Sequence, residues 1–173
     1  MSRSLRPDGL ANNAMHVRLK LVLDCEPDAA WAAIARPEAF RAVSAPLTTF
    51  ESLTVTGFPE SWTPGLPHLV SLRLFGVIPL GTQTIDVAFS ERRDGVRMMT
   101  DSGQAVAGPL AVIDSWDHRI AISATADGRT LYRDQLTFSA GAATPLVWAG
   151  LWLFWQWRAI GLARTARGWQ VTP

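Results

Sequence analysis

SWDHRIAISATADGRTLYRDQLTF, residues 115–138, holds two runs of alternating apolar and polar residues on either side of a short segment with Asp127 and Gly128. Alternation with a period of two is typical of strands that bury one face, and an Asp-Gly pair between two such runs is a strong turn signal. The stretch therefore predicts an antiparallel hairpin, with strands over 110–124 and 130–140.

The register of this hairpin depends on the length of its loop. A two-residue turn of Asp127 and Gly128 would place Ile120 and Ile122 on the same face as polar Gln135 and Arg133. A three-residue loop over 126–128 gives one largely apolar face, and Gly128 supplies the left-handed residue that such a loop requires. We therefore expect the three-residue loop, with the facing pairs Trp116–Phe138, His118–Leu136, Ile120–Asp134 and Ile122–Tyr132.

Five more strands precede this hairpin. Period-two alternation predicts the first over 16–24, and turn residues rich in Gly, Pro and Asp separate the others. The short connections GVIPLG, ERRDG and ADGR indicate antiparallel neighbours. The remaining predicted strands lie at 48–55, 68–76, 81–90 and 96–102.

Helical signals lie at both ends of the strand series. In CEPDAAWAAIARPEAFRAV, residues 25–43, Pro27 and Asp28 favour a helix start, and Pro37 interrupts the pattern, so two short helices are predicted. Near the C-terminus, Thr144 and Pro145 resemble an N-cap and a first helical residue, and Gly168 is a natural stop. One long helix is therefore expected to close the chain.

This order of elements predicts an α+β fold, in which a curved antiparallel sheet of about six or seven strands wraps around the long C-terminal helix. Three stretches, AAWAAIARPEAF, LFGVIPLG and WDHRI followed by GRTLYRDQLTF, resemble the START-like or SRPBCC superfamily, which has the helix-grip fold and includes polyketide cyclase/dehydrase-like proteins. The resemblance covers roughly residues 16–168. It implies a deep cavity between sheet and helix for sterols, lipids, polyketides or other apolar ligands.

Composition limits the class of protein. With 173 residues, 48% of them hydrophobic, the chain suits one domain, which we place at 15–173 after a flexible arm at 1–14. A net charge of +1 argues against nucleic-acid binding.

A single Cys25 and the lack of a signal-peptide pattern favour the cytoplasm. The apolar run 145–155 meets Gln156 and Arg158 before the roughly 20 residues needed to cross a bilayer.

No metal or cofactor is expected. The three histidines, His16, His68 and His118, are far apart, and no HExxH motif is present. GxGxxG, P-loop and GxSxG motifs are also missing from the sequence, which removes the usual parts for nucleotide binding and for α/β-hydrolase chemistry.

His118, Tyr132 and Asp134 form the most promising polar group, because the predicted register places all three on the inner apolar face. A buried carboxylate must be paired, hydrogen-bonded or neutral. In a functional interpretation, Asp134 and Tyr132 orient a polar group of a ligand, and His118 acts as an acid or base. In a purely structural interpretation, Asp134 pairs with Arg73 or Arg97 and His118 lies at the rim.

The final helix has almost no polar face over its first turns. Helical spacing favours Leu146, Gly150, Leu153, Trp157 and Ile160 as the face toward the sheet. Trp148, Trp152 and Trp155 would then form an apolar patch for a homodimer or a membrane surface, unless the segments before residue 67 cover them. The helix dipole is sufficient to explain Arg158, Arg164 and Arg167.

These observations favour binding of a hydrophobic small molecule such as a lipid, quinone or polyketide, with transport or sequestration as possible purposes. Two alternatives are a cyclase or dehydrase that uses His118, Tyr132 or Asp134, and a membrane- or partner-contacting module that delivers a lipid. A noncatalytic role is the preferred hypothesis. The predicted ligand-binding residues are Trp116, His118, Ile120, Ile122, Tyr132, Asp134, Leu136, Phe138, Gly150, Leu153 and Trp157.

Overall fold

The computed structural model describes residues 13–169. Its strands are β1 (Met15–Leu23), β2 (Thr48–Ser52), β3 (His68–Leu74), β4 (Ile78–Ile85), β5 (Val87–Glu91), β6 (Arg97–Asp101), β7 (Ala105–Ala107), β8 (Ser115–Ala124) and β9 (Thr130–Ser139). Its α-helices are α1 (Pro27–Ile34), α2 (Pro37–Ser44) and α3 (Thr144–Thr165). Short 3₁₀ turns lie at Pro109–Val112, Gly141–Ala143 and Ala166–Gly168.

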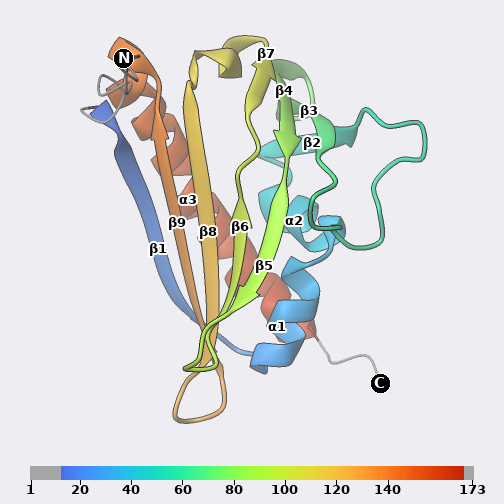
Figure 1. Ribbon diagram of the computed structural model, residues 1–173, viewed down its shortest axis with the longest axis vertical. Coiled ribbons are helices and arrows are strands. Elements are labelled where there is room, and N and C mark those ends of the chain that lie inside the picture. Colours follow the sequence, from blue (N-terminus) through green and yellow to red (C-terminus); the bar gives the residue numbers. More distant parts are fainter. Residues whose placement is uncertain (1–12, 170–173) are drawn as a thin grey trace, which may run out of the picture.

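The strands form two antiparallel sheets that curve around α3. One sheet has the order β1-β9-β8-β6-β5, and the other has the order β2-β3-β4-β7. The long helix α3 crosses behind the first sheet, and the smaller sheet lies beside it above α2 (Figure 1). This is the predicted α+β helix-grip arrangement, with two short helices after the first strand.

The predicted number of strands was too low. The nine strands of residues 13–169 lie in two sheets, where one sheet of six or seven was expected. The predicted strand 81–90 is divided between β4 and β5 at Asp86, whose amide donates to the side-chain carboxylate of Asp101 at 2.9 Å rather than to a backbone carbonyl. Residues 109–112 form a 3₁₀ turn, which Pro109 favours as its first residue, so β8 begins at Ser115.

The predicted hairpin register is confirmed. Trp116 faces Phe138, His118 faces Leu136, Ile120 faces Asp134 and Ile122 faces Tyr132. The amide of Thr125 donates to the Arg129 carbonyl at 2.8 Å, which closes the loop around residues 126–128. Gly128 has φ 81°, the left-handed conformation that the three-residue loop requires.

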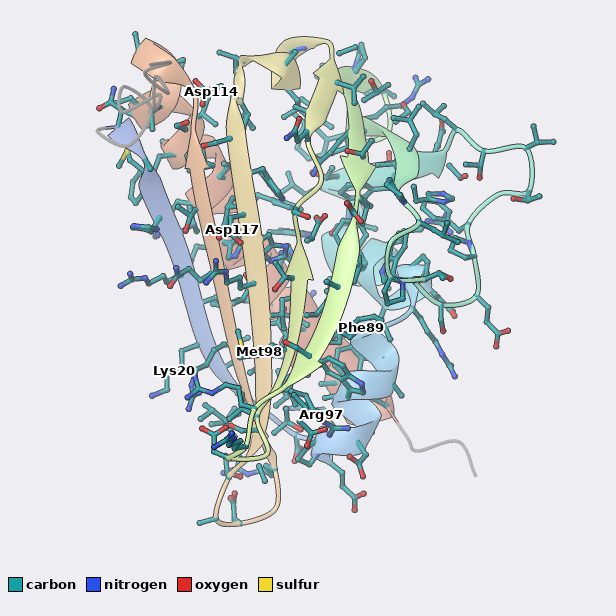
Figure 2. The ribbon with its side chains drawn as sticks, in the orientation of Figure 1. Lys20, Phe89, Arg97, Met98, Asp114 and Asp117 are labelled. Carbon is teal, nitrogen blue, oxygen red and sulfur yellow. The ribbon has the colours of Figure 1, made fainter. Side chains whose placement is uncertain are left out.

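The two faces of the larger sheet differ in polarity. Inward-facing Ile122, Tyr132, Leu136 and Phe138 are fully buried against the helical layer. Figure 2 shows Lys20 and Asp117 on the face that points away from α3. The alternation of apolar and polar residues in these strands therefore shows which side chains face the helix.

The short helices close the remaining side of the core. Each begins with a proline, at Pro27 and Pro37. Helix α1 is held to the sheet by Arg97, which binds Asp28 at 2.7 Å (Figure 2). Helix α2 lies directly on α3, where a side chain at Gly161 would place its Cβ 2.6 Å from the Val43 carbonyl oxygen. These contacts bring Phe40 of α2 to the edge of the interior.

Two sequence predictions concern the chain ends and membranes. Apart from residues 13 and 14, the predicted arm lies outside the described residues. Within residues 13–169, no helix has the length and apolar character needed to cross a membrane.

Candidate functional site

An apolar cavity of about 440 Å³ lies between the smaller sheet, the inner face of β8 and the first half of α3. Leu72 and Leu74 contribute from β3, Leu110 from the 3₁₀ turn, and Leu151 and Phe154 from α3. Cavities of this size, lined largely by apolar side chains and with a few convergent polar groups, are typical of small-molecule sites.

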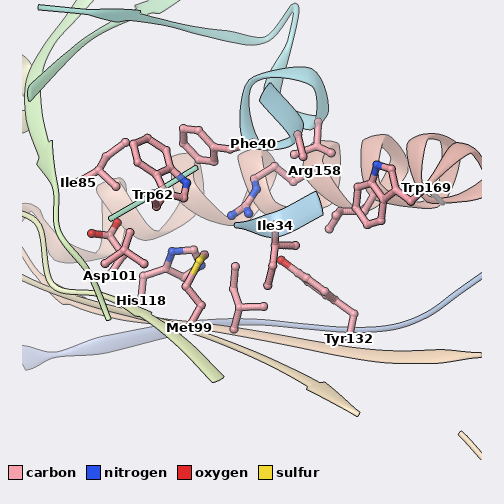
Figure 3. Close-up of a pocket in the computed structure, with 15 residues that line it drawn as sticks. Ile34, Phe40, Trp62, Ile85, Met99, Asp101, His118, Tyr132, Arg158 and Trp169 are labelled. Carbon is pink, nitrogen blue, oxygen red and sulfur yellow. The ribbon is translucent and has the colours of Figure 1, made fainter. Parts of the chain in front are cut away.

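The polar groups of the cavity gather at its inner end. A second cavity of about 40 Å³ adjoins the first, and Asp101, His118 and Arg158 line both. In Figure 3 these three side chains converge from β6, β8 and α3 on the same space, with Tyr132 on the far side. We call Asp101, His118, Asp134 and Arg158 the polar cluster.

Asp134 organises the polar cluster through four side-chain contacts. Its Oδ1 lies 2.8 Å from Nε2 of His118 and accepts a hydrogen bond from Nε1 of Trp155 at 2.9 Å. Its Oδ2 accepts from the hydroxyl of Tyr132 at 3.0 Å and lies 3.4 Å from Nη1 of Arg158. The carboxylate is therefore fully partnered behind the cavity wall, which is how a buried charge becomes tolerable.

The charge state of Asp134 determines the tautomer of His118. Burial acts to raise the pKa of Asp134, but the charges of His118 and Arg158 and the hydrogen bonds from His118 and Trp155 outweigh it and lower this pKa to about 2. An ionised carboxylate can only accept hydrogen bonds. Neutral His118 must therefore carry its proton on Nε2, and its Nδ1 is a bare lone pair with no partner among the described residues.

Tyr132 stays a hydrogen-bond donor in this arrangement. Burial and the nearby charge of Asp134 raise the pKa of Tyr132 well above 10.0, so the phenol keeps its proton. Together with the donors from His118 and Trp155, this hydroxyl fixes the carboxylate in position. Tyr132 thus acts on Asp134, not on the contents of the larger cavity.

Asp101 is the second buried carboxyl group of the polar cluster. Its Oδ1 accepts hydrogen bonds from the amides of Asp86 and Gly103, both at 2.9 Å. Burial raises the pKa of Asp101, against the opposing influences of His118, the two amides and the indole of Trp116. Asp101 is thus held by backbone donors, and no arginine, lysine or histidine of residues 13–169 lies within ion-pair distance of it.

Arg158 was not expected in the site. The helix dipole is insufficient to explain it, because the side chain is only 4% exposed and lies beside Asp134. Neither of the arginines proposed as partners of Asp134 reaches it: Arg73 lies 3.8 Å from Glu51, and Arg97 binds Asp28. The arginine that pairs with Asp134 therefore comes from α3 and not from the sheet.

The predicted ligand-binding residues separate into three groups. Trp116, His118, Gly150 and Leu153 line the larger cavity, and Ile120 and Tyr132 line the smaller one. The inward-facing Ile122, Leu136 and Phe138 are fully buried, Asp134 lies behind His118, and none of these four lines either cavity. Trp157 donates to the Ala45 carbonyl at 3.1 Å and also lines neither.

The predicted inner face of α3 was right only for Gly150 and Leu153, which line the larger cavity. Leu146, Leu153 and Ile160 are 79%, 61% and 49% exposed, whereas Trp155, assigned to the outer patch, is 1% exposed. The helix is turned so that Trp155 and Arg158 reach Asp134. The predicted Trp patch is therefore reduced to Trp148 and Trp152, whose rings are stacked with their centres 6.4 Å apart.

Asp101 and Arg158 are the polar-cluster residues that sequence reasoning did not assign to the site. Arg158 does carry a signal: it follows an apolar stretch and lies three positions after Trp155, on the same side of the helix. Asp101 lies near the end of the predicted strand 96–102, in phase with buried Met99. A charged residue on the buried face of a strand or helix indicates that its side chain has a hydrogen-bond or ion-pair partner inside the protein.

Comparisons with known proteins concern the fold. Neither family models nor curated proteins match this sequence. Among solved structures, the Zhui aromatase/cyclase from Streptomyces sp. R1128 is 12% identical, with 90% of this chain and 92% of that one covered and a TM-score of 0.54. Norcoclaurine synthase from Thalictrum flavum, solved with dopamine and hydroxybenzaldehyde, is 8% identical over 99% of both chains, with a TM-score of 0.62.

A Chromobacterium violaceum protein is 17% identical over 88% of this chain and 96% of that one, with a TM-score of 0.60. The chain shares the helix-grip fold of these structures. At these identities the likeness concerns the fold alone, so any activity must be argued from the polar cluster and the cavity.

Within residues 13–169, no three His, Cys, Asp or Glu residues are grouped to hold a metal ion.

Proposed function

We propose that this protein binds a hydrophobic small molecule, such as a lipid, quinone or polyketide, in the cavity of about 440 Å³. The observation that carries this proposal is a cavity wall made mostly of apolar side chains, interrupted by a small number of polar groups that include Asp101, His118 and Arg158. Affinity would come mainly from buried apolar area, at roughly 25 cal/mol per Å² before the costs of ordering the ligand.

Gly150 offers a way to test this proposal, because it lines the cavity and a Cβ added there meets no atom within 4 Å. The variant Gly150→Phe should fill the cavity without straining the helix. Ala149→Phe is the matched control, since Ala149 is exposed and does not line the cavity.

The measurement is a fluorescence titration with the neutral apolar probe N-phenyl-1-naphthylamine. Wild type and Ala149→Phe should bind the probe with similar affinity, and Gly150→Phe should bind it at least tenfold more weakly. Equal binding by all three proteins would place the probe outside the cavity and remove the proposal.

A second candidate function is proton transfer on the bound molecule, as in a cyclase or dehydrase. It is favoured by one observation: Asp134 holds Nε2 of His118 at 2.8 Å, which leaves Nδ1 as a base on the cavity side. In the proposed step, Nδ1 takes a proton from a carbon next to a ligand carbonyl, and the C–H electron pair becomes an enolate. Return of that proton to another atom completes an isomerisation or prepares a ring closure.

Exchange of hydrogen for deuterium tests this step without knowledge of the natural substrate. In D₂O, wild-type protein should accelerate deuteration of the methyl group of 2-acetylnaphthalene, followed by NMR, and His118→Gln should lose about 100-fold or more of that acceleration. Probe binding by His118→Gln should stay within a few-fold of wild type. Undiminished exchange in His118→Gln would exclude His118 as the base.

A further inference from the structure

We propose, building on the binding function above, that the ligand carries a neutral carbonyl group whose oxygen accepts a hydrogen bond from Nε of Arg158. Arg158 is 3% exposed, and its Nε is a buried donor that has no partner among residues 13–169. A buried donor without an acceptor costs about 1–3 kcal/mol. Because Arg158 lines both cavities, a ligand oxygen can satisfy this donor.

The surroundings of Arg158 restrict other ways to satisfy the donor. Its guanidinium carbon lies 5.0 Å from the Trp155 ring centre and 5.9 Å from those of Phe40 and Phe154. Three aromatic rings and the Asp134 carboxylate thus enclose the guanidinium. These rings also provide flat apolar walls for the part of the ligand that bears the carbonyl.

The charges of the polar cluster favour a neutral acceptor over a carboxylate. The guanidinium of Arg158 is already paired with ionised Asp134 at 3.4 Å, and Asp101 adds a second carboxyl group to the lining of the same cavity. The polar cluster therefore has no surplus positive charge with which to balance a buried anion. A ketone, quinone or ester oxygen needs only the hydrogen bond.

Three naphthalenes with similar apolar bodies test this inference: 2-acetylnaphthalene, 2-ethylnaphthalene and 2-naphthoate. Their dissociation constants can be measured by displacement of N-phenyl-1-naphthylamine. Wild type should bind the ketone at least about tenfold more tightly than the hydrocarbon, as expected for a hydrogen bond to a charged donor. It should also bind the ketone more tightly than the carboxylate.

The variant Arg158→Lys retains a positive charge for Asp134 but lacks the Nε donor. Its preference for the ketone over 2-ethylnaphthalene, measured as the ratio of the two dissociation constants, should fall below threefold. Arg164→Lys, an exposed change later in the same helix, should keep the full preference.

The series separates failure of this inference from failure of the proposed function. Equal affinity of wild type for ketone and hydrocarbon would overturn the carbonyl assignment while leaving ligand binding intact, and this result does not depend on the folding of any variant. Tightest binding of 2-naphthoate would overturn the choice of a neutral ligand. If none of the three compounds or the probe bound, the binding function itself would be wrong, and the inference with it.

Discussion

Asp134 and Asp101 are two buried carboxyl groups on opposite sides of His118, yet their surroundings move their pKa values in opposite directions. Asp134, on β9, is lowered to about 2, because cationic and hydrogen-bonding side chains outweigh the cost of burial. Asp101, on β6, is raised, because burial outweighs His118 and two backbone amides. The surroundings of Asp134 stabilise its ionised form, whereas the surroundings of Asp101 favour its neutral form.

This difference suggests separate roles. A permanently charged Asp134 can orient His118 and Arg158 without taking part in proton transfer. Asp101 lies on the cavity side, where its proton affinity can respond to a ligand. Divergent pKa values in neighbouring acids are typical of sites that carry out acid–base chemistry.

Replacement of Asp134 should have the largest effect on stability. Asp134→Asn removes the negative charge from beside buried Arg158, and breaking a buried ion pair from one side costs about 3–5 kcal/mol. Urea unfolding of the wild type and the variant at pH 7 measures this loss. Asp117→Asn, at a solvent-exposed pair with Arg119, is the control and should leave the unfolding midpoint nearly unchanged. A similarly small change in Asp134→Asn would contradict the assigned role of Asp134.

The pH dependence of stability in acid should reveal the charge of Asp134 in a second way. Because the folded-state pKa of Asp134 is about 2 and its ordinary value is 3.8, its contribution is complete above pH 4 and is lost as the pH falls toward 2. The expected contribution is about 2 kcal/mol. Unfolding free energies measured between pH 5 and pH 2 should fall more steeply for wild type than for Asp134→Asn. Parallel curves would show that Asp134 is not stabilised as an anion.

The sequence predicted the hairpin better than it predicted the helix that packs on it. Strand residues alternate between two faces, so Gly128 and the apolar pattern were enough to set the pairs from Trp116–Phe138 to Ile122–Tyr132. Helix α3 is apolar on nearly all sides near its start, so its pattern defines no inner face. Its orientation instead depends on the contact of Arg158 with Asp134, a partner 24 positions away (158 − 134) that spacing alone cannot identify.

Removal of a single donor to Asp134 should have an intermediate effect. Tyr132→Phe deletes the hydroxyl that donates to Oδ2 at 3.0 Å and keeps the buried ring. The loss should be about 1.5 kcal/mol, the lower end for a hydrogen bond to a charged group. It is measured by urea unfolding. In the background of Asp134→Asn the same change should cost clearly less, and equal losses in both backgrounds would mean that the hydroxyl does not act through Asp134.

Replacement of Asp101 should have the smallest effect, and its sign can differ from that of Asp134. A raised folded-state pKa means that stability decreases as the pH rises from 3.8 toward the folded value, because the folded protein then gives up the proton of Asp101 less readily than the unfolded chain does. Asp101→Asn removes that loss of stability while its amide oxygen can still accept from the amides of Asp86 and Gly103. We expect a change within about 1 kcal/mol at pH 7, neutral or stabilising. A loss as large as that of Asp134→Asn would remove the distinction between the two sites.

The central claim is that the cavity of about 440 Å³ holds a hydrophobic small molecule. Native mass spectrometry of the purified wild type beside Gly150→Phe tests it most directly, with 2-acetylnaphthalene added to any protein that carries no ligand from the expressing cells. The account predicts that the wild type has the mass of the polypeptide plus one small molecule, which is released on denaturation, and that Gly150→Phe has the mass of the polypeptide alone. Identical bare masses for both proteins, with and without added ketone, would contradict it.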